Sequence, residues 1–140
     1  MTLPTQMTAV QATALWSGLM VLLLVVLGIR VALARRGNKV LLGDGGNDAV
    51  LLASRVFGNA AEYIPVAIGA MVVLTLLGMP APVIHSLGGL LFLGRLIHAA
   101  SLSTQKPTLG RVVGMILTWL PLLTAGGMLV VHAFVGVPHG

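Results

Sequence analysis

Long apolar stretches alternate with short polar ones along the 140-residue chain. This pattern predicts a bundle of four transmembrane helices in a single domain, an all-α integral membrane fold. Each stretch holds about 20 residues or more and can therefore cross a hydrocarbon core of about 30 Å. The predicted spans are residues 8–32, 48–77, 82–101 and 108–134.

Composition supports this interpretation, because 57% of the residues are hydrophobic and 8% are charged. A soluble domain has roughly 25% charged residues. The chain contains no cysteine, which excludes disulfides, thiolate metal sites and cysteine nucleophiles. The basic residues are spread over membrane loops and form no module for reading nucleic acid, so we expect no nucleic-acid partner.

The positive charges predict an orientation in the membrane. Four spans place the first loop (residues 35–46) and the third loop (residues 104–110) on the same side of the membrane. Most of the basic residues lie in these loops or next to them: Arg30, Arg35, Arg36, Lys39, Lys106 and Arg111. The positive-inside rule places both loops in the cytoplasm and both termini outside. The first ten residues lack the positive region of a secretory signal, so we expect the first span to be retained. The short length and low charge suggest a bacterial inner membrane.

The second span carries an unusual polar face. Arg55, Asn59 and Glu62 are spaced i, i+4 and i+7, and Tyr63 lies at the edge of the same helical face. Charged side chains within a membrane are costly, and they usually face a bundle interior or a cavity that has a function. Pro65 favours a kink next to them. We therefore expect a polar pocket that opens towards the cytoplasm.

A purely structural role is the alternative for these charges. Arg55, Glu62 and Arg95 of the third span could form a buried ion-pair network that fixes helix packing without any chemistry. This alternative does not explain why Asn59 and Tyr63 share the face.

Further candidate residues lie near the cytoplasmic ends of the last two spans. Arg95 could extend to the interface, and His98, three residues later, could act as a general base or make a packing hydrogen bond. Arg111 begins the fourth span, as an interfacial anchor or as a cation that stabilises a substrate thiolate beside a helix N-terminus. The remaining histidines lack the spacing of metal ligands and lie towards the opposite face, so we assign no metal site; they are His85, His132 and His139.

Small residues predict close helix approach at several points. They are Gly88, Gly89, Gly94, Gly110, Gly114, Gly126 and Gly127.

The run from Arg55 to Pro65 resembles the second transmembrane helix of the MAPEG family, the membrane-associated proteins in eicosanoid and glutathione metabolism. The resemblance extends to Arg95 in the third span and to Arg111 after a loop that contains Pro107. It covers nearly the whole chain.

Membership implies a homotrimer of four-helix subunits that holds glutathione in a U-shape at each subunit interface, open to the cytoplasm. The glutathione-binding residues would be Arg55, Asn59, Glu62, Tyr63, Arg95 and His98, and Arg111 would be the catalytic residue that stabilises the thiolate. Eicosanoid-forming members have tyrosines in the third span where this chain has His98 and Leu102. This difference argues against a leukotriene or prostaglandin synthase.

These observations predict a membrane glutathione transferase-like enzyme with a role in detoxification. Glutathione would be its co-substrate, conjugated to a lipophilic electrophile from the lipid bilayer or used to reduce it, as in a peroxidase. The alternative is a non-catalytic membrane scaffold or partner-binding subunit that keeps the fold. A small transporter that uses Glu62 is a third hypothesis, although the chain shows no paired broken helices and no inverted repeat.

Overall fold

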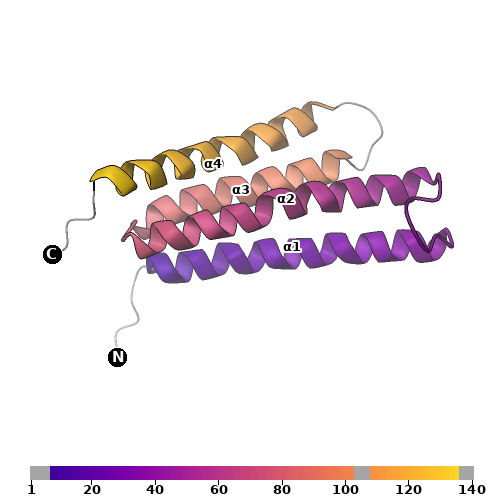
Figure 1. Cartoon of the computed structure of the whole chain (residues 1–140), viewed down its shortest axis with the longest axis horizontal. Helices are drawn as coiled ribbons and strands as arrows, with labels where there is room; N and C mark the ends of the chain where they lie inside the picture. Colours follow the sequence, from indigo (N-terminus) through magenta and orange to yellow (C-terminus); the bar gives the residue numbers. More distant parts are fainter. Residues whose placement is uncertain (1–6, 103–107, 136–140) are drawn as a thin grey trace.

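The protein is a bundle of long antiparallel helices in a computed structural model that describes residues 7–102 and 108–135 (Figure 1). All four helices are long and apolar enough to cross a membrane, and the described residues contain no strand. The predicted fold class is therefore confirmed at the level of one subunit. The helices are α1 (Ala9–Gly37), α2 (Asp48–Leu76), α3 (Ala81–Leu102) and α4 (Leu109–Val135).

Local capping explains where α2 begins. The side-chain oxygen of Asn47 accepts hydrogen bonds from the backbone N–H groups of Ala49 and Val50, at 3.0 and 3.2 Å. Asn47 is thus the N-cap residue that its type predicts. Asp48 follows in the first turn, where its negative charge complements the positive end of the helix dipole.

Helix α1 is longer than its predicted membrane span, because it continues past Ala32 to Gly37. The extra turn contains Arg35 and Arg36. Hydropathy marks only the apolar part of a helix, whereas cations at a helix C-terminus stabilise the last turn outside that part. The span and the helix therefore end at different residues.

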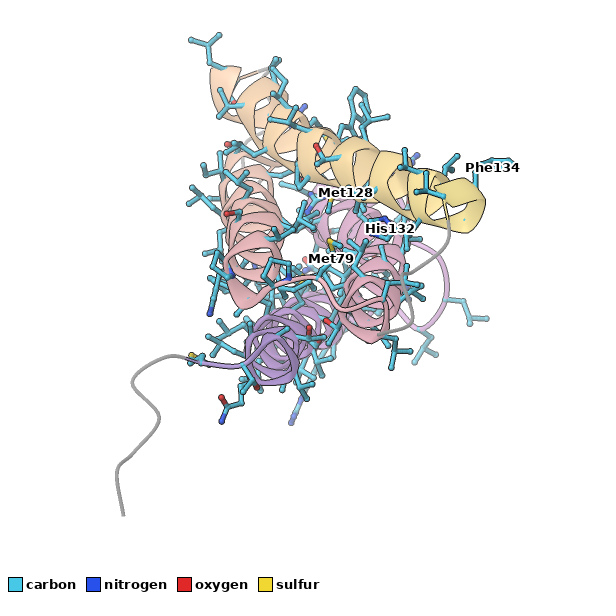
Figure 2. All side chains as sticks on the ribbon, turned by 90° about the vertical axis from the view of Figure 1, so that its left-hand side faces the viewer. Met79, Met128, His132 and Phe134 are labelled. Carbon is cyan, nitrogen blue, oxygen red and sulfur yellow. The ribbon has the colours of Figure 1, made fainter. Side chains whose placement is uncertain are left out.

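The two inner helices of the bundle are α2 and α3. Both α1 and α4 contact α2 and α3, and α1 does not contact α4 within the described residues. The α2–α3 turn lies at the same end of the bundle as the start of α1 and the end of α4 (Figure 1). Viewed from that end, α4 lies obliquely across the other helices (Figure 2).

One stripe of α2 forms much of the hydrophobic core. Its members recur every three or four residues, the spacing of a single helical face, and face buried residues of α1 and α3. They are Val56, Ala60, Ile64, Ala67, Met71 and Leu74. The polar face of α2 lies directly beside this stripe, since Arg55 and Asn59 each precede a core residue.

Glycines bring α3 and α4 into backbone contact near the candidate site. A Cβ atom on Gly94 would lie 2.9 Å from the carbonyl carbon of Leu117, and one on Gly114 would lie 2.7 Å from the backbone nitrogen of His98. The predicted close approach is confirmed there. Around Gly126 and Gly127, by contrast, no described atom lies within 4 Å of an added Cβ.

Candidate functional site

An open groove follows the polar face of α2. Its volume is about 460 Å³, within the roughly 300–1,000 Å³ typical of small-molecule sites. Six of the lining residues belong to one helical stripe of α2, and the seventh comes from α3. They are Leu51, Ser54, Arg55, Gly58, Asn59, Glu62 and His98.

The two charged residues of the groove are both exposed. Arg55 and Glu62 are seven residues apart on one face, which separates their Cα atoms by roughly 10 Å along the axis. A single subunit thus presents one cation and one anion at the two ends of the groove. Within one subunit, Arg55 and Glu62 therefore lie on the outer face of α2 and not beside the buried Arg95.

Arg95 is buried behind the groove, with 1% of its surface exposed. One of its terminal nitrogens donates a 2.8 Å hydrogen bond to the side-chain oxygen of Asn59. The guanidinium carbon lies 5.4 Å from the centre of the Tyr63 ring, within the range of a cation–π interaction. The other two guanidinium nitrogens have no hydrogen-bond partner among the described residues. Arg95 therefore holds Asn59 and Tyr63 rather than reaching the interface.

Tyr63 extends this polar chain from the buried Arg95 to the surface of α4. The indole nitrogen of Trp119 donates a 3.1 Å hydrogen bond to the Tyr63 hydroxyl oxygen. Trp119 also lines a shallow apolar hollow of about 400 Å³ with Leu122 and Leu123. Sequence reasoning missed this contact, because nothing in the local pattern links Trp119 to Tyr63.

His98 lines the groove from α3 and is 5% exposed. Its Nδ1 atom is buried and has no hydrogen-bond partner within the described part of the chain. The packing hydrogen bond that we considered for His98 is thus not made by this nitrogen.

Arg111 lies half-buried in the first turn of α4. It precedes Gly114 by three residues on the same face, and Gly114 packs on His98. The described residues that line the groove come from α2 and α3 only, so Arg111 lies beside His98 rather than in the groove wall. The structure brings together Arg55, Asn59, Glu62 and His98, with Arg95 and Tyr63 behind them.

Sequence reasoning missed three of the groove residues. Leu51, Ser54 and Gly58 share the helical stripe of the predicted residues. The 3.6-residue period alone would have found them.

His85 and His132 do not line the groove, in agreement with their predicted separation from it. His85 accepts a 3.1 Å hydrogen bond at Nδ1 from the indole nitrogen of Trp16. His132 is in the last turn of α4 and its Nδ1 lies 2.7 Å from the carbonyl oxygen of Met128. His139 is outside the described residues. Within the described part of the chain, no three residues of the types His, Cys, Asp and Glu cluster as a metal site.

The fold and the groove together define a multi-pass membrane protein with an open groove on one inner helix that is lined by both a cation and an anion. A family comparison agrees with this class: the MAPEG family model matches residues 13–131. The chain belongs to the MAPEG family, and the resemblance recognised from the sequence is confirmed.

Two curated relatives carry the name inner membrane protein YecN. One is from Escherichia coli strain K12 and the other from Escherichia coli O6:H1 strain CFT073. Each is 36% identical over 111 residues, a match that covers 79% of this chain and 84% of the relative. No solved structure matches the chain. The relatives' name refers to a membrane location, which agrees with a multi-pass integral membrane protein here.

Proposed function

We propose that the protein is a membrane glutathione transferase-like enzyme with its active site in the α2 groove. The observation that carries the proposal is the pairing of Arg55 and Glu62 in one groove with Asn59 between them. Glutathione has carboxylates at both ends and an ammonium group at one. Arg55 would bind a carboxylate and Glu62 the ammonium group, while Asn59 and His98 would hydrogen-bond the peptide groups.

Buried Arg95 supports this role as a positioning residue. Its hydrogen bond fixes the oxygen of the Asn59 amide, which turns the amide N–H₂ group away from Arg95 and leaves it for a ligand carbonyl. Its contact with the Tyr63 ring holds that side chain at the back of the site. Binding groups held in this way lose little freedom when a ligand binds.

Arg111 is the residue that we assign to the thiol. Nearby cations and helix N-termini lower the pKa of a thiol from about 8.5, and Arg111 provides both in the first turn of α4. The thiol proton would leave to water on the cytoplasmic side. The thiolate sulfur would then form a bond to the electrophilic carbon of the second substrate. Either a leaving group departs from that carbon with its bonding electron pair, or the π electron pair of an activated double bond moves to the adjacent atom, which takes a proton from water.

The second substrate would enter from the lipid bilayer. The hollow at Trp119, Leu122 and Leu123 is almost entirely apolar and lies on the outer surface of α4, so it suits a lipophilic molecule. Trp119 connects this hollow to Tyr63 at the back of the groove. The electrophile would thus approach glutathione from the lipid side while glutathione enters from the cytoplasm.

Assembly follows from the exposure of the groove. Because Arg55 and Glu62 are exposed in one subunit, a second copy can cover the groove and complete the binding site. The family resemblance and this exposure together support a homotrimer in a bacterial inner membrane, with the first and third loops cytoplasmic and both termini outside. Native mass spectrometry in mild detergent tests the trimer, and a monomer would contradict it.

Glutathione binding to the detergent-purified protein tests the function directly. We expect binding by calorimetry and a rise in thiolate absorbance when glutathione is added. Glu62→Ala should weaken binding by roughly tenfold, whereas Asp48→Asn removes an exposed acidic group outside the groove and should leave binding unchanged. Arg111→Ala should keep binding but lose the thiolate signal; a pKa lowered by two units corresponds to about 2.7 kcal/mol.

The scaffold alternative makes the opposite prediction. If the wild-type protein and Glu62→Ala alike bind no glutathione at millimolar concentration, the enzyme proposal is wrong. The polar chain from Asn59 through Arg95 and Tyr63 to Trp119 would then serve helix packing alone.

A further inference from the structure

The loop between α1 and α2, residues 38–47, displays two apolar side chains outside the bundle. Three apolar residues follow one another there, and only Val40 packs inward. A Cβ on Gly45 would lie 2.9 Å from a methyl group of Val40, and Gly45 has a φ of 61°, so a glycine is required at this contact. Leu41 and Leu42 are 92% and 88% exposed. No large hydrophobic side chain in the described part of the chain is more exposed than Leu41.

Hydrogen bonds give this loop a defined shape. The side-chain amide of Asn47 donates to the side-chain oxygen of Asn38 at 2.9 Å, which joins the two ends of the loop. The backbone N–H of Val40 donates to the carbonyl of Arg35 at 3.0 Å. The two leucines are therefore held outward by the loop fold.

Basic residues lie next to the exposed leucines. The guanidinium group of Arg35 donates to the carbonyl oxygen of Leu41 at 3.4 Å, which places this cation against the apolar tip. Arg36 and Lys39 are in the same segment and are exposed.

The two acidic residues of this region follow the leucines. The carboxylate of Asp44 accepts a 3.0 Å hydrogen bond from the backbone of Gly46, and Asp48 lies in the first turn of α2. Both carboxylates keep their negative charge at the start of α2. Because the same region contains Arg35, Arg36 and Lys39, residues 35–48 together have a net positive charge.

Helix length places the loop at the membrane surface. Helix α1 has 29 residues, roughly 43 Å of helix, which exceeds a hydrocarbon core of about 30 Å. Its last turn and the loop that follows therefore lie at the level of the lipid headgroups. Apolar side chains combined with nearby cations bind an anionic membrane interface by burial and by charge.

We propose that residues 39–42, together with Arg35 and Arg36, form an interfacial anchor for anionic phospholipid. Leu41 and Leu42 insert beneath the headgroups, and the phosphates lie against the basic side chains. This inference does not depend on the glutathione chemistry, because none of these residues lines the α2 groove.

The absence of cysteine in the chain allows a direct test with single-cysteine variants. Leu41→Cys and Leu42→Cys would each be labelled with the environment-sensitive dye NBD and reconstituted in phosphatidylglycerol or phosphatidylcholine nanodiscs. Gly37→Cys is the reference for a surface position outside the proposed anchor, because Gly37 is exposed in the last turn of α1 and an added Cβ there meets no described atom within 4 Å. Leu123→Cys is the lipid reference, because Leu123 is 75% exposed on a membrane-spanning helix.

We expect blue-shifted emission at positions 41 and 42 in phosphatidylglycerol, with quenching by a lipid spin-labelled near its headgroup. Both signals should weaken in phosphatidylcholine and in an Arg35→Gln/Arg36→Gln background. Emission at both positions that matches Gly37→Cys would overturn the anchor. Blue-shifted but unquenched emission would also overturn it and would indicate contact with a second copy. Equal quenching in the two lipids would refute recognition of the anionic headgroup.

Discussion

Two neighbouring polar regions of the molecule differ in burial. On α2, Arg55 and Glu62 are exposed in an open groove, whereas Arg95 and His98 on α3 are 1% and 5% exposed. Asn59 connects the regions, because it lines the groove and accepts the hydrogen bond of Arg95. Four of them, Arg55, Asn59, Glu62 and Arg95, belong to the pattern that resembles the family, whereas His98 departs from its eicosanoid-forming members. Burial divides this pattern into groups that can reach a ligand and groups that hold the helices in place.

Because the two regions differ in burial, substitutions in them should affect different properties, stability in one and ligand binding in the other. A residue of the buried region is surrounded by backbone, so a change there alters packing and stability. A residue of the groove contacts little protein in one subunit, so a change there should alter ligand binding and leave stability unchanged. A substitution therefore assigns a residue to one region or the other by whether it changes stability or ligand binding.

The largest effect is expected at the contact of α3 with α4. An added Cβ on Gly114 would lie 2.7 Å from the backbone nitrogen of His98, and neither backbone can move away without separating the helices. Gly114→Ala should therefore destabilise the protein by about 1–3 kcal/mol, the usual range for overpacking. Unfolding in mixed micelles of increasing sodium dodecyl sulfate measures this change.

The matched control for Gly114 is Gly58 in the groove. An added Cβ on Gly58 meets no described atom within 4 Å. Since glycine inside a helix is less favourable than alanine by about 1 kcal/mol, Gly58→Ala should leave stability unchanged or raise it. Equal destabilisation by both variants would show that the groove is also closely packed, by a second copy, in the folded protein.

Glu62 provides the next largest effect, on binding alone. Glu62→Gln keeps the shape of the side chain and removes the charge that we pair with the ammonium group of glutathione. Because Glu62 is exposed, we expect a loss near the lower end for charge-assisted hydrogen bonds, about 1.5 kcal/mol, or roughly tenfold in Kd. Calorimetry measures the affinity. A marked loss of stability would instead place Glu62 among the groups that hold the helices.

The sequence predicted the helices and the groove face well, and for one physical reason. Membrane spans and helical faces are determined by local periodicity, so the polar stripe from Arg55 to Glu62 could be recognised without tertiary information. The N-cap at Asn47 is equally local. Contacts between distant residues carry no such signal. The hydrogen bond from Trp119 to Tyr63 joins residues 56 positions apart, and the pairing of Arg95 with Asn59 in place of Glu62 depends on helix packing.

His98 tests the boundary between the regions, because it is buried and also lines the groove. Its Nδ1 has no partner within the described residues, so His98→Leu removes no hydrogen bond from the free protein at this atom. Stability should therefore be unchanged or slightly higher, while glutathione affinity should fall by about 1 kcal/mol through one lost hydrogen bond. Thermal unfolding and calorimetry on the same preparation measure both quantities.

His85 on the same helix is the control for His98. His85→Leu breaks the hydrogen bond from Trp16 and should lower stability without affecting glutathione. If His98→Leu behaves like His85→Leu, the imidazole of His98 belongs to the packing region only.

The smallest effect is expected at Trp119, the exposed end of the polar chain that begins at Asn59 and Arg95. Trp119→Phe keeps an aromatic ring beside the apolar hollow but removes the N–H that donates to the Tyr63 hydroxyl. Trp119 is 51% exposed, so the net loss of stability should be about 0.5 kcal/mol, at the low end for a neutral hydrogen bond. Tyr63 keeps its contact with Arg95, so glutathione binding should change less than in Glu62→Gln. Turnover of a lipophilic electrophile provides the decisive comparison. A rise in KM for the electrophile alone would place Trp119 on the entry path of that substrate. A fall in glutathione affinity as large as that in Glu62→Gln would instead mean that the polar chain and the groove act as one unit.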